Sequence, residues 1–468
     1  MLDELMTAGA IVIILLLDFM IKEKKGIIAG FYTLFTLALL GFVAYYKRDG
    51  ILFLGAYVYD GLSWFSKIII LAGAFLTGLL SINTIKINKK YIGAYYAILL
   101  SSVLGMMVLV SSKELITMYV GLETTTISLY ALTAIYKKDD FSLEAGIKYL
   151  VLGVISSAVL LYGISLVYAS TGSTSLERIM SFTGTNGSNA LFITGVIMML
   201  LGMGFKLSMV PMHVWTPDVY QGAPTPITAF ISVASKAAGF IFALRVLSYT
   251  FVKFSFIWVP IVSILASLTM TIGNLVAIHQ KNVKRLLAYS TISQAGYILV
   301  GFVGASVEGM SSVLFYLVAY TVTNMAAFAV IIGLSNITSS DELDDYSGLA
   351  QREPLLALTF LLALLSLAGI PPLAGFVGKF YLFYAAMQKG YLWLVIAGAL
   401  NSTISLYYYL LVLKHMYIFD RTKEYPKIKL TFGVRVALLL TIAAILLIGI
   451  FPFYFVDKTI EISQRLFM

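Results

Sequence analysis

Cysteine is absent from this chain of 468 residues, and histidine occurs only three times, at His213, His279 and His415. Without cysteine the chain cannot form a disulfide, bind a thiolate-ligated iron-sulfur cluster or attach a c-type haem. Three histidines could ligate one bis-histidine haem at most, which argues against an electron-carrying role. No GxGxxG or GxxxxGK[ST] stretch occurs, so no phosphate-binding loop is predicted. We therefore expect no cofactor and no metal in this chain.

Charged residues are also scarce, at 12%, whereas hydrophobic residues make up 60% and the mean hydropathy is +0.93. Apolar runs of 18 or more residues recur from end to end, and each is long enough to cross a hydrocarbon core about 30 Å thick. The first run lacks a basic n-region and a small-residue cleavage site, so we interpret it as a retained helix. The sequence predicts an all-α polytopic membrane protein with a single transmembrane domain, residues 1–468.

About fourteen transmembrane helices are expected, and two of them should be broken by proline. Pro211 cannot donate to the carbonyl of Leu207 and crowds it, and Pro371-Pro372 should interrupt a later span in the same way. The expected spans are 5–21, 27–46, 61–81, 91–110, 114–135, 143–169, 190–220 (broken), 226–249, 257–278, 284–304, 311–335, 354–387 (broken), 391–417 and 430–454.

The formal net charge of +9 is better explained by the positive-inside bias of short loops than by binding of nucleic acid, and we expect no nucleic-acid partner. One set of loops holds sixteen basic residues: Lys22, Lys24, Lys25, Lys86, Lys89, Lys90, Lys137, Lys138, Lys281, Lys284, Arg285, Arg352, Arg421, Lys423, Lys427 and Lys429. The side shared with the termini holds eight: Lys47, Arg48, Lys113, Arg178, Lys253, Lys389, Lys458 and Arg465. This asymmetry places both termini outside and the lysine-rich loops, including the acidic loop 341–345, in the cytoplasm.

The two predicted breaks lie five spans apart, and each has a lysine near it, Lys206 and Lys379. An odd offset inverts the topology, and paired discontinuous helices in inverted repeats indicate a transport site near the bilayer midplane. The alternative is that prolines are simply common in membrane helices.

Four ionisable residues lie deep in the apolar spans: Glu123, Lys206, Lys236 and Lys379. A lysine at the bilayer centre costs about 2.5 to 3.5 kcal/mol on insertion scales, so it usually faces a protein interior, a partner charge or a water-filled path. We interpret Glu123 as the partner of a buried lysine, with Lys206 as the first candidate, in a proton relay. The alternatives are a protonated Glu123 hydrogen-bonded to a neighbouring threonine, Thr124 or Thr126, and lysines held in static ion pairs or by carbonyl groups.

Three further residues are weaker candidates. Lys148 and Arg245 stand near span ends, where either side chain could reach the interface. His213 would share the face of Lys206 if the helix resumed after Pro211, but it could equally stabilise the fold beside Trp215.

Several stretches resemble the antiporter-like membrane subunits of proton-pumping NADH:quinone oxidoreductase, respiratory complex I. They are PMHVWTPDVYQGAPTP (Pro211 to Pro226), IKYLVLGVISSAVLLYGISLVY (Ile147 to Tyr168), NVKRLLAYSTISQAGYILVG (Asn282 to Gly301), LSLAGIPPLAGFVGKFYLF (Leu365 to Phe383) and ALNSTISLYYYLLVLKHMY (Ala399 to Tyr417). The DVYxGAP form and the lysine in GFVGK resemble the subunit N branch rather than the L and M branches.

The resemblance implies fourteen helices with two inverted five-helix repeats, about 91–249 and 257–417. It implies a proton relay through Glu123, Lys206, Lys236 and Lys379, with Lys148 as a further member. It also implies that quinone reduction in other subunits drives the relay, and that flavin, iron-sulfur clusters and quinone belong to those subunits. The expected partners are an antiporter-like subunit of the M type and small subunits of the K and J types, in the inner membrane of a bacterium with both termini on the periplasmic side.

Two other functions stay open at the level of sequence. Related chains occur in multisubunit cation/proton antiporters and in membrane-bound hydrogenase-type complexes that do not oxidise NADH. A purely structural spacer is the third interpretation, although four costly intramembrane charges argue against it.

Overall fold

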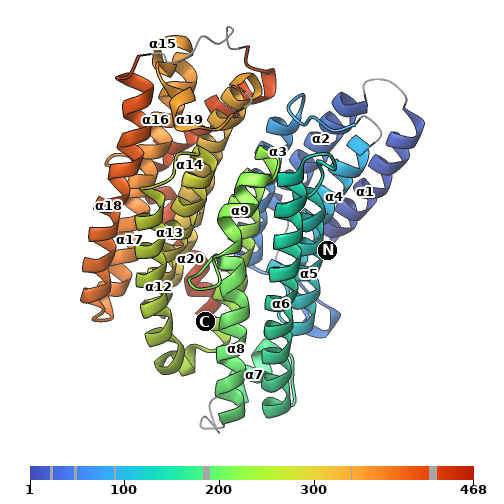
Figure 1. The fold of residues 1–468 in the computed structure, drawn as a ribbon. Coiled ribbons are helices and arrows are strands. Elements are labelled where there is room, and N and C mark those ends of the chain that lie inside the picture. Colours follow the sequence, from blue (N-terminus) through green and yellow to red (C-terminus); the bar gives the residue numbers. More distant parts are fainter. Residues whose placement is uncertain are drawn as a thin grey trace.

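The computed structural model is a bundle of long helices that run roughly side by side (Figure 1). It describes residues 1–21, 25–46, 50–88, 91–182, 190–338, 340–420 and 429–467. The helices are α1 Leu2–Met20, α2 Lys25–Tyr46, α3 Gly61–Ser81, α4 Ile92–Ser111, α5 Leu115–Thr133, α6 Asp140–Thr171, α7 Leu176–Phe182, α8 Ala190–Leu207, α9 Trp215–Gly222, α10 Thr225–Phe230, α11 Lys236–Ala243, α12 Ser255–Ala277, α13 Val283–Val303, α14 Val307–Thr338, α15 Leu349–Arg352, α16 Pro354–Ala368, α17 Ala374–Gln388, α18 Leu392–Tyr417, α19 Phe432–Ile450 and α20 Phe453–Phe467.

Short elements connect these helices. Two π-helical segments, η3 Ile231–Ser235 and η4 Leu244–Thr250, flank α11. The 3₁₀ turns are η1 Phe53–Gly55, η5 Val252–Phe254 and η6 Leu343–Tyr346. Strands β1 Gly50–Leu52 and β2 Tyr57–Tyr59 pair in antiparallel register, with Ile51 opposite Val58.

Twelve of the described helical segments are long and apolar enough to cross a membrane, so the multi-pass membrane fold is confirmed. The other two predicted spans are helical but do not meet that criterion. Span 5–21 corresponds to α1, which contains Asp3, Glu4 and Asp18, and span 354–387 is divided into α16 and α17, of 15 residues each. The count of fourteen therefore stays a prediction.

Both predicted breaks are confirmed. Helix α8 ends at Leu207, four residues before Pro211, and α9 begins at Trp215. Helix α16 ends at Ala368, and α17 begins at Ala374 beyond the two prolines. A residue with positive φ directly follows each first half: Ser208, with φ 57°, and Gly369, with φ 89°. This left-handed conformation ends a helix, and glycine adopts it readily.

The last predicted span is too long, because the chain turns at Pro452 and continues as α20. Proline cannot continue a helix, so α19 ends at Ile450. Helix α20 packs against α14 and α3. Sequence reasoning missed this helix, α7 and the hairpin of β1 and β2.

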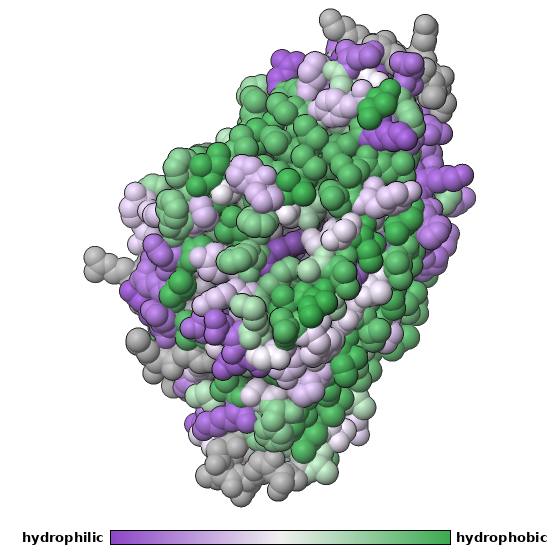
Figure 2. Space-filling model, turned by 90° about the vertical axis from the view of Figure 1, so that its left-hand side faces the viewer, coloured by the Kyte–Doolittle hydropathy of each residue, from purple (hydrophilic) through white to green (hydrophobic). Residues whose placement is uncertain are grey.

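The bundle contains helices that are buried at its centre and helices that expose apolar faces on its outside. Helices α10, α11, α13 and α14 are almost entirely buried, whereas α6, α12 and α18 keep wide apolar faces exposed. Figure 2 shows apolar side chains over much of one face, with hydrophilic ones gathered toward its ends. Polar residues on the central helices therefore lie inside protein and away from the apolar exterior.

We call the end of the bundle formed by the loops 82–88, 134–139, 223–224, 278–282 and 340–348 the lysine-rich face; these loops surround one cavity. It lies toward the top of Figure 1, where α15 is labelled. Several basic residues used to predict the orientation fall outside the described residues: Lys22, Lys24, Lys47, Arg48, Lys89, Lys90, Arg421, Lys423 and Lys427.

Candidate functional site

Glu123 lies on α5 and faces α6, where the hydroxyl of Ser157 donates a hydrogen bond to its carboxylate. Neither threonine that we considered as an alternative partner contacts it. The hydroxyls of Thr124 and Thr126 each donate to a carbonyl oxygen of their own helix. The partner of Glu123 thus comes from the next helix, which a search of local sequence could not identify.

Lys206 stands in the last turn of α8, and its Nζ donates to the hydroxyl of Thr126. Thr126 follows Glu123 by three residues on α5, so both side chains lie on one face of that helix. Aromatic rings enclose the ammonium group, with centroids 5.5, 5.7 and 5.9 Å from Nζ in Phe205, Tyr130 and Tyr149. Among the described residues, no carboxylate lies within ion-pair distance of Nζ. Glu123 and Lys206 share one region through Thr126, and their functional pairing stays a prediction.

Lys236 is 2% exposed and lies at the junction of η3 and α11. Its Nζ donates to the hydroxyl of Ser208, 3.0 Å away, in the break of the seventh span. Thr216 of α9 donates to the same hydroxyl at 2.9 Å. The break therefore supplies the polar partner of Lys236, two residues beyond Lys206. Single π-helical turns often occur at functional sites, and sequence reasoning missed this one.

A series of hydrogen bonds connects the turn before Lys236 with α13. Asn324 of α14 donates to Ser232 of η3 at 2.9 Å and to the hydroxyl of Tyr320 at 3.0 Å. Tyr320 donates in turn to Thr291 of α13 at 3.0 Å. All four of these polar side chains are buried. They form a polar path through the most enclosed part of the bundle.

The path continues along α13 to the second broken helix. Gln294, one turn beyond Thr291, accepts from Tyr316 and donates to the carbonyl oxygen of Leu367 at 2.9 Å. The adjacent carbonyl of Ala368, the last residue of α16, accepts from Lys379 Nζ at 3.1 Å.

Lys379 also donates to Ser402 at 3.0 Å and lies 4.2 Å from the ring centroid of Tyr297. It is 4% exposed, and no carboxylate of the described residues pairs with it. The helix break thus provides the carbonyl group that binds this lysine, which was one of our two structural alternatives.

Lys148 lies at the lysine-rich face, where its Nζ is 2.8 Å from Asp218 and 2.7 Å from Glu144. Arg285 of α13 binds the other oxygen of Asp218 at 2.7 Å, so Asp218 joins α6, α9 and α13. With 41% of its side chain exposed, Lys148 is separate from the buried path. The structure places Lys148, Asp218 and Arg285 together. The sequence did not predict this cluster.

The resumed helix that would give His213 the same face as Lys206 is not formed, and a role for His213 stays a prediction. Residues 208–214 form turns, and α9 begins only at Trp215, so His213 does not share a helical face with Lys206. For Arg245 the sequence left surface anchoring and function equally open, and the structure does not bring its side chain to the surface. Arg245 is fully buried and forms two hydrogen bonds with Asp60, at 2.7 and 3.0 Å.

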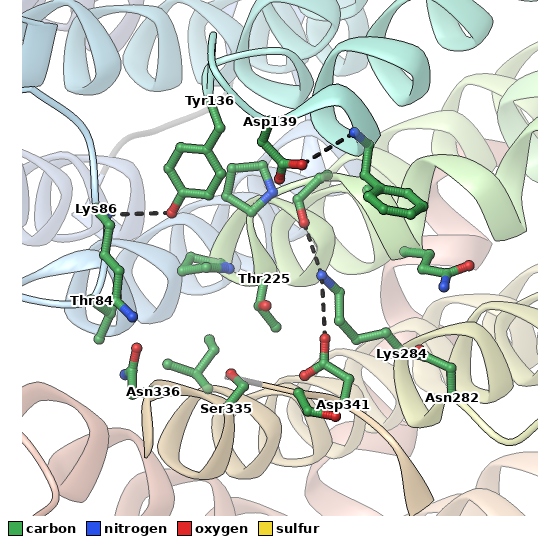
Figure 3. A pocket seen from close by; sticks show the side chains of 18 of the residues that line it. Thr84, Lys86, Tyr136, Asp139, Thr225, Asn282, Lys284, Ser335, Asn336 and Asp341 are labelled. Carbon is green, nitrogen blue, oxygen red and sulfur yellow. Dashed lines mark hydrogen bonds and ion pairs between the residues drawn. The ribbon is translucent and has the colours of Figure 1, made fainter. Parts of the chain in front are cut away.

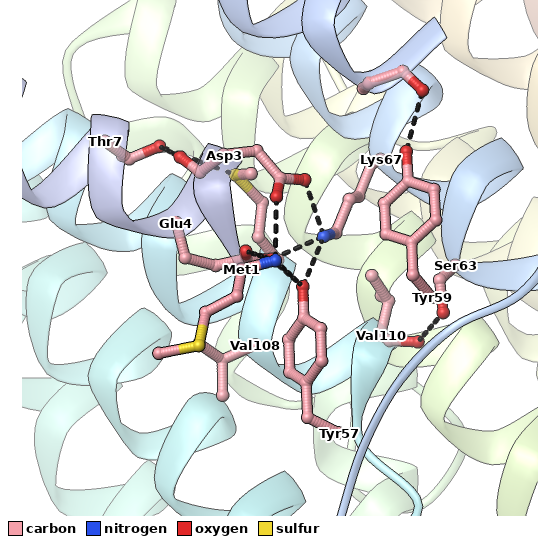
Figure 4. Close-up of polar contacts among 12 residues, drawn as sticks. Met1, Asp3, Glu4, Thr7, Tyr57, Tyr59, Ser63, Lys67, Val108 and Val110 are labelled. Atoms are coloured by element: carbon pink, nitrogen blue, oxygen red, sulfur yellow. Dashed lines mark hydrogen bonds and ion pairs between the residues drawn. The ribbon is translucent and has the colours of Figure 1, made fainter. Parts of the chain in front are cut away.

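Sequence reasoning also missed a cluster of buried charges around Lys67, near the start of α3 (Figure 4). Lys67 is fully buried and binds Asp3 at 2.7 Å, Glu4 and the hydroxyl of Tyr57 at 2.9 Å. The α-amino group of Met1 contacts the same three partners. A lysine inside the apolar span 61–81 was the available signal.

Among the described residues, no group of three or more histidine, aspartate or glutamate side chains could hold a metal ion.

Comparisons with known proteins agree on one family. The family model described as "NADH:quinone oxidoreductase/Mrp antiporter, TM" matches residues 112–405. The chain is 46% identical to NADH-quinone oxidoreductase subunit N of Moorella thermoacetica, over 89% of this chain and 87% of that protein. The chain belongs to this family. It is also 40% identical to NAD(P)H-quinone oxidoreductase subunit 2 of a Nostoc species, over 93% of this chain and 87% of that protein.

Solved structures of the family have the same architecture. A chain of respiratory complex I from Thermus thermophilus with bound aureothin matches with a TM-score of 0.84 and 33% identity, over 97% of this chain and 98% of that one. The Mrp complex from Dietzia matches with a TM-score of 0.88 over 100% of this chain and 98% of that one, but at 20% identity this likeness shows the fold alone. All six predicted site residues of this chain lie within the region that the family model matches: Glu123, Lys148, Lys206, His213, Lys236 and Lys379.

Proposed function

We propose that this chain is a membrane subunit of an NADH:quinone oxidoreductase and translocates protons through the buried path from Lys206 to Lys379. The observation that carries the proposal is that Lys206, Lys236 and Lys379 have no carboxylate partner among the described residues and lie along one series of buried polar groups. Burial penalises a charge, and an opposite charge offsets that penalty. Lysines without such a partner can therefore exchange protons, whereas tightly paired ones are fixed in the charged form.

In the proposed mechanism, protons reach Lys206 and Lys236 from the lysine-rich face and leave by Lys379. Ser208 lies two residues beyond Lys206 in the chain and binds Lys236, so the break brings the first two lysines into one region. The hydroxyl and amide groups of Ser232, Asn324, Tyr320 and Thr291 link the turn before Lys236 to α13. Glu123, three residues from the threonine that binds Lys206, would regulate the charge of that lysine.

Energy must come from other subunits. Moving one charge against 100 mV requires about 2.3 kcal/mol, so a redox partner has to drive the path. We assign this to quinone reduction in subunits that carry flavin and iron-sulfur clusters. This chain is the non-redox, translocating part of the complex, and its neighbours are an antiporter-like subunit of the M type and small subunits of the K and J types.

The proposal includes an arrangement of the chain in the membrane. Two inverted repeats, about 91–249 and 257–417, each contain one broken helix. The lysine-rich face lies in the cytoplasm and both termini lie in the periplasm of a bacterial inner membrane, because basic loops stay inside. A cation/proton antiporter subunit without electron transfer is not favoured, because the relatives that are 40 to 46% identical are named quinone oxidoreductase subunits.

Lys236→Arg tests the proposal, because arginine keeps the positive charge but does not release a proton near neutral pH. In vesicles containing the assembled complex, we expect this variant to assemble and to lose most of the membrane potential driven by the electron donor. Lys253→Arg is the matched control, since Lys253 is exposed in the turn after the same span. Unchanged pumping stoichiometry in Lys236→Arg would contradict the proposal, and donor-independent sodium-driven proton flux would favour the antiporter.

A further inference from the structure

A polar cavity of about 570 Å³ opens at the lysine-rich face, between the first and second halves of the chain (Figure 3). One water molecule takes about 30 Å³ of liquid volume, so the cavity has room for on the order of ten waters. Its lining comes from five separate loops and from the helix ends beside them, and the charged groups on it are Lys86, Asp139, Lys284, Asp341 and Glu342. The predicted relay residues are not part of this lining.

Lys284 is the buried charge of this cavity, with 5% of its surface exposed. Its Nζ donates to the carbonyl oxygen of Ala223 at 3.0 Å, and its distance to Asp341 Oδ2 is 3.9 Å, too long for a hydrogen bond. An ammonium group has three donors, so two of them have no partner among the described residues. In Figure 3 this ammonium group points toward the carboxylate of Asp341.

Asp341 is held in place by its backbone rather than by this loose ion pair. Its carbonyl oxygen accepts from Val283 N at 2.8 Å, and Leu343 N donates to Lys281 O at 2.8 Å, so the loop is fastened to the start of α13. Its Oδ1 atom is buried and has no hydrogen-bond partner among the described residues. Burial raises the pKa of the Asp341 carboxyl, and the nearby Lys284 ammonium opposes this shift. In folded proteins, most buried polar atoms are satisfied by a protein group or by ordered water.

The polar path passes along α13, the helix that carries Lys284. Thr291 follows Lys284 by seven residues, which is two turns or about 10 Å along one face of α13. Thr291 then connects through Tyr320 and Asn324 to Ser232, one turn before Lys236. Two turns of α13 therefore separate Lys284 from the hydrogen-bonded series that leads to the turn before the central lysine.

We propose that this cavity is a proton-uptake vestibule, in which Lys284 accepts protons from cavity water and passes them toward Lys236. A hydronium ion at the cavity floor gives its proton to the neutral amine of Lys284, which leaves water and an ammonium group. The ammonium then gives a proton to a water molecule on the side of Thr291, and the neutral amine is restored. Asp341 stabilises the charged form without fixing it, because the two groups stay 3.9 Å apart. The inference rests on the proposed function and adds an entrance that is distinct from Lys206.

The decisive variant is Lys284→Arg, studied in inside-out vesicles that contain the assembled complex. Arginine can still donate to Ala223 and face Asp341, but it does not release a proton. We expect normal assembly and loss of most of the donor-driven membrane potential, measured with a potential-sensitive dye while a potassium/proton exchanger removes the pH gradient. Lys281→Arg is the control, because Lys281 is exposed three residues earlier and does not line the cavity. A wild-type potential in Lys284→Arg would overturn the inference.

A second variant, Lys284→Ala, separates proton transfer from a structural role. It leaves a space at the floor of the cavity that methylammonium added on the exposed cytoplasmic face can enter. Restoration of the potential by methylammonium, but not by the non-titrating tetramethylammonium, is the expected result, and equal lack of rescue by both contradicts it. Lys236→Arg is measured in parallel. If Lys236→Arg blocks pumping and Lys284→Arg does not, the vestibule alone is wrong; if neither blocks it, the proposed function itself fails.

Discussion

At the scale of single residues, the site consists of lysines bound by neutral oxygen atoms. Thr126 binds Lys206, Ser208 binds Lys236, and the carbonyl of Ala368 binds Lys379. The sequence predicted these lysines because a charged residue within an apolar run can be recognised from the local sequence alone. It did not predict their partners, because each partner lies on another helix or in a break whose path depends on tertiary packing.

Thr126→Val tests whether such a neutral partner matters for proton transfer. Valine has the same shape but removes the hydroxyl that accepts from Lys206. A hydrogen bond to a charged group contributes about 1.5 to 3 kcal/mol, and 1.36 kcal/mol changes a rate tenfold, so we expect donor-driven pumping to fall roughly 10- to 100-fold.

Thr124→Val is the matched control for this substitution. The Thr124 hydroxyl donates only to a carbonyl of its own helix at 2.8 Å, so its loss should leave pumping unchanged. Equal pumping rates for the two variants, measured in vesicles with equal amounts of assembled complex, would show that the contact to Thr126 has no role in the relay.

At the scale of elements, the two broken spans were predicted from proline, and the π-helical segments around Lys236 were not. Proline acts locally, through its missing N–H group and its ring, so its effect can be read from the sequence. The π segments η3 and η4 contain no such residue and depend on the packing of α10 and α11 against α3, α4 and α8. The sequence likewise did not predict the close packing of α16 against α17, the two halves of the second broken span.

Gly375→Ala tests this approach. A Cβ atom at Gly375 would lie 1.9 Å from the carbonyl oxygen of Ser366, so α17 would have to move away from α16. Lys379 lies one turn further along α17, and the contact of its Nζ with Ala368 would lengthen. We expect a destabilisation of about 1 to 3 kcal/mol and lower pumping, measured as the amount of assembled complex and its donor-driven potential. Gly41→Ala in α2, where no atom lies within 4 Å of the new Cβ, should match the wild type in both measurements.

At the scale of the whole molecule, buried ion pairs fasten α1 and α3 to the rest of the bundle. Lys67 joins α3 to α1, and Arg245 joins η4 to Asp60 at the start of α3. Arg245 also donates to the carbonyl of Val110 in α4 at 3.0 Å. The partners are separated by 64 and 185 residues, so no local pattern could reveal them. Family membership and the multi-pass fold followed from the sequence, whereas these long-range pairs required the packed structure.

Asp60→Asn tests the second of these pairs. The substitution leaves the fully buried Arg245 without its counter-charge, and removing one partner of a buried pair costs about 3 kcal/mol or more. We expect a lower temperature at which protease cleaves this chain in detergent-solubilised complex. Glu461→Gln is the control, because Glu461 pairs with Lys458 and Arg465 at the surface, where such pairs contribute about 0 to 1 kcal/mol.

The pH dependence of stability provides a second test of the pair formed by Asp60 and Arg245. Burial alone raises the pKa of the Asp60 carboxyl, but the Arg245 guanidinium outweighs burial and holds that pKa below its ordinary value. A carboxyl whose pKa is lowered by folding stabilises the protein at every pH above its unfolded pKa of about 3.9, and this contribution is lost only as the pH falls through the folded value. The difference in cleavage temperature between wild type and Asp60→Asn should therefore stay constant from about pH 8 to pH 5. A difference that disappears within this range would mean that Asp60 is already protonated there, and that Arg245 is stabilised by Val110 and Ser63 instead.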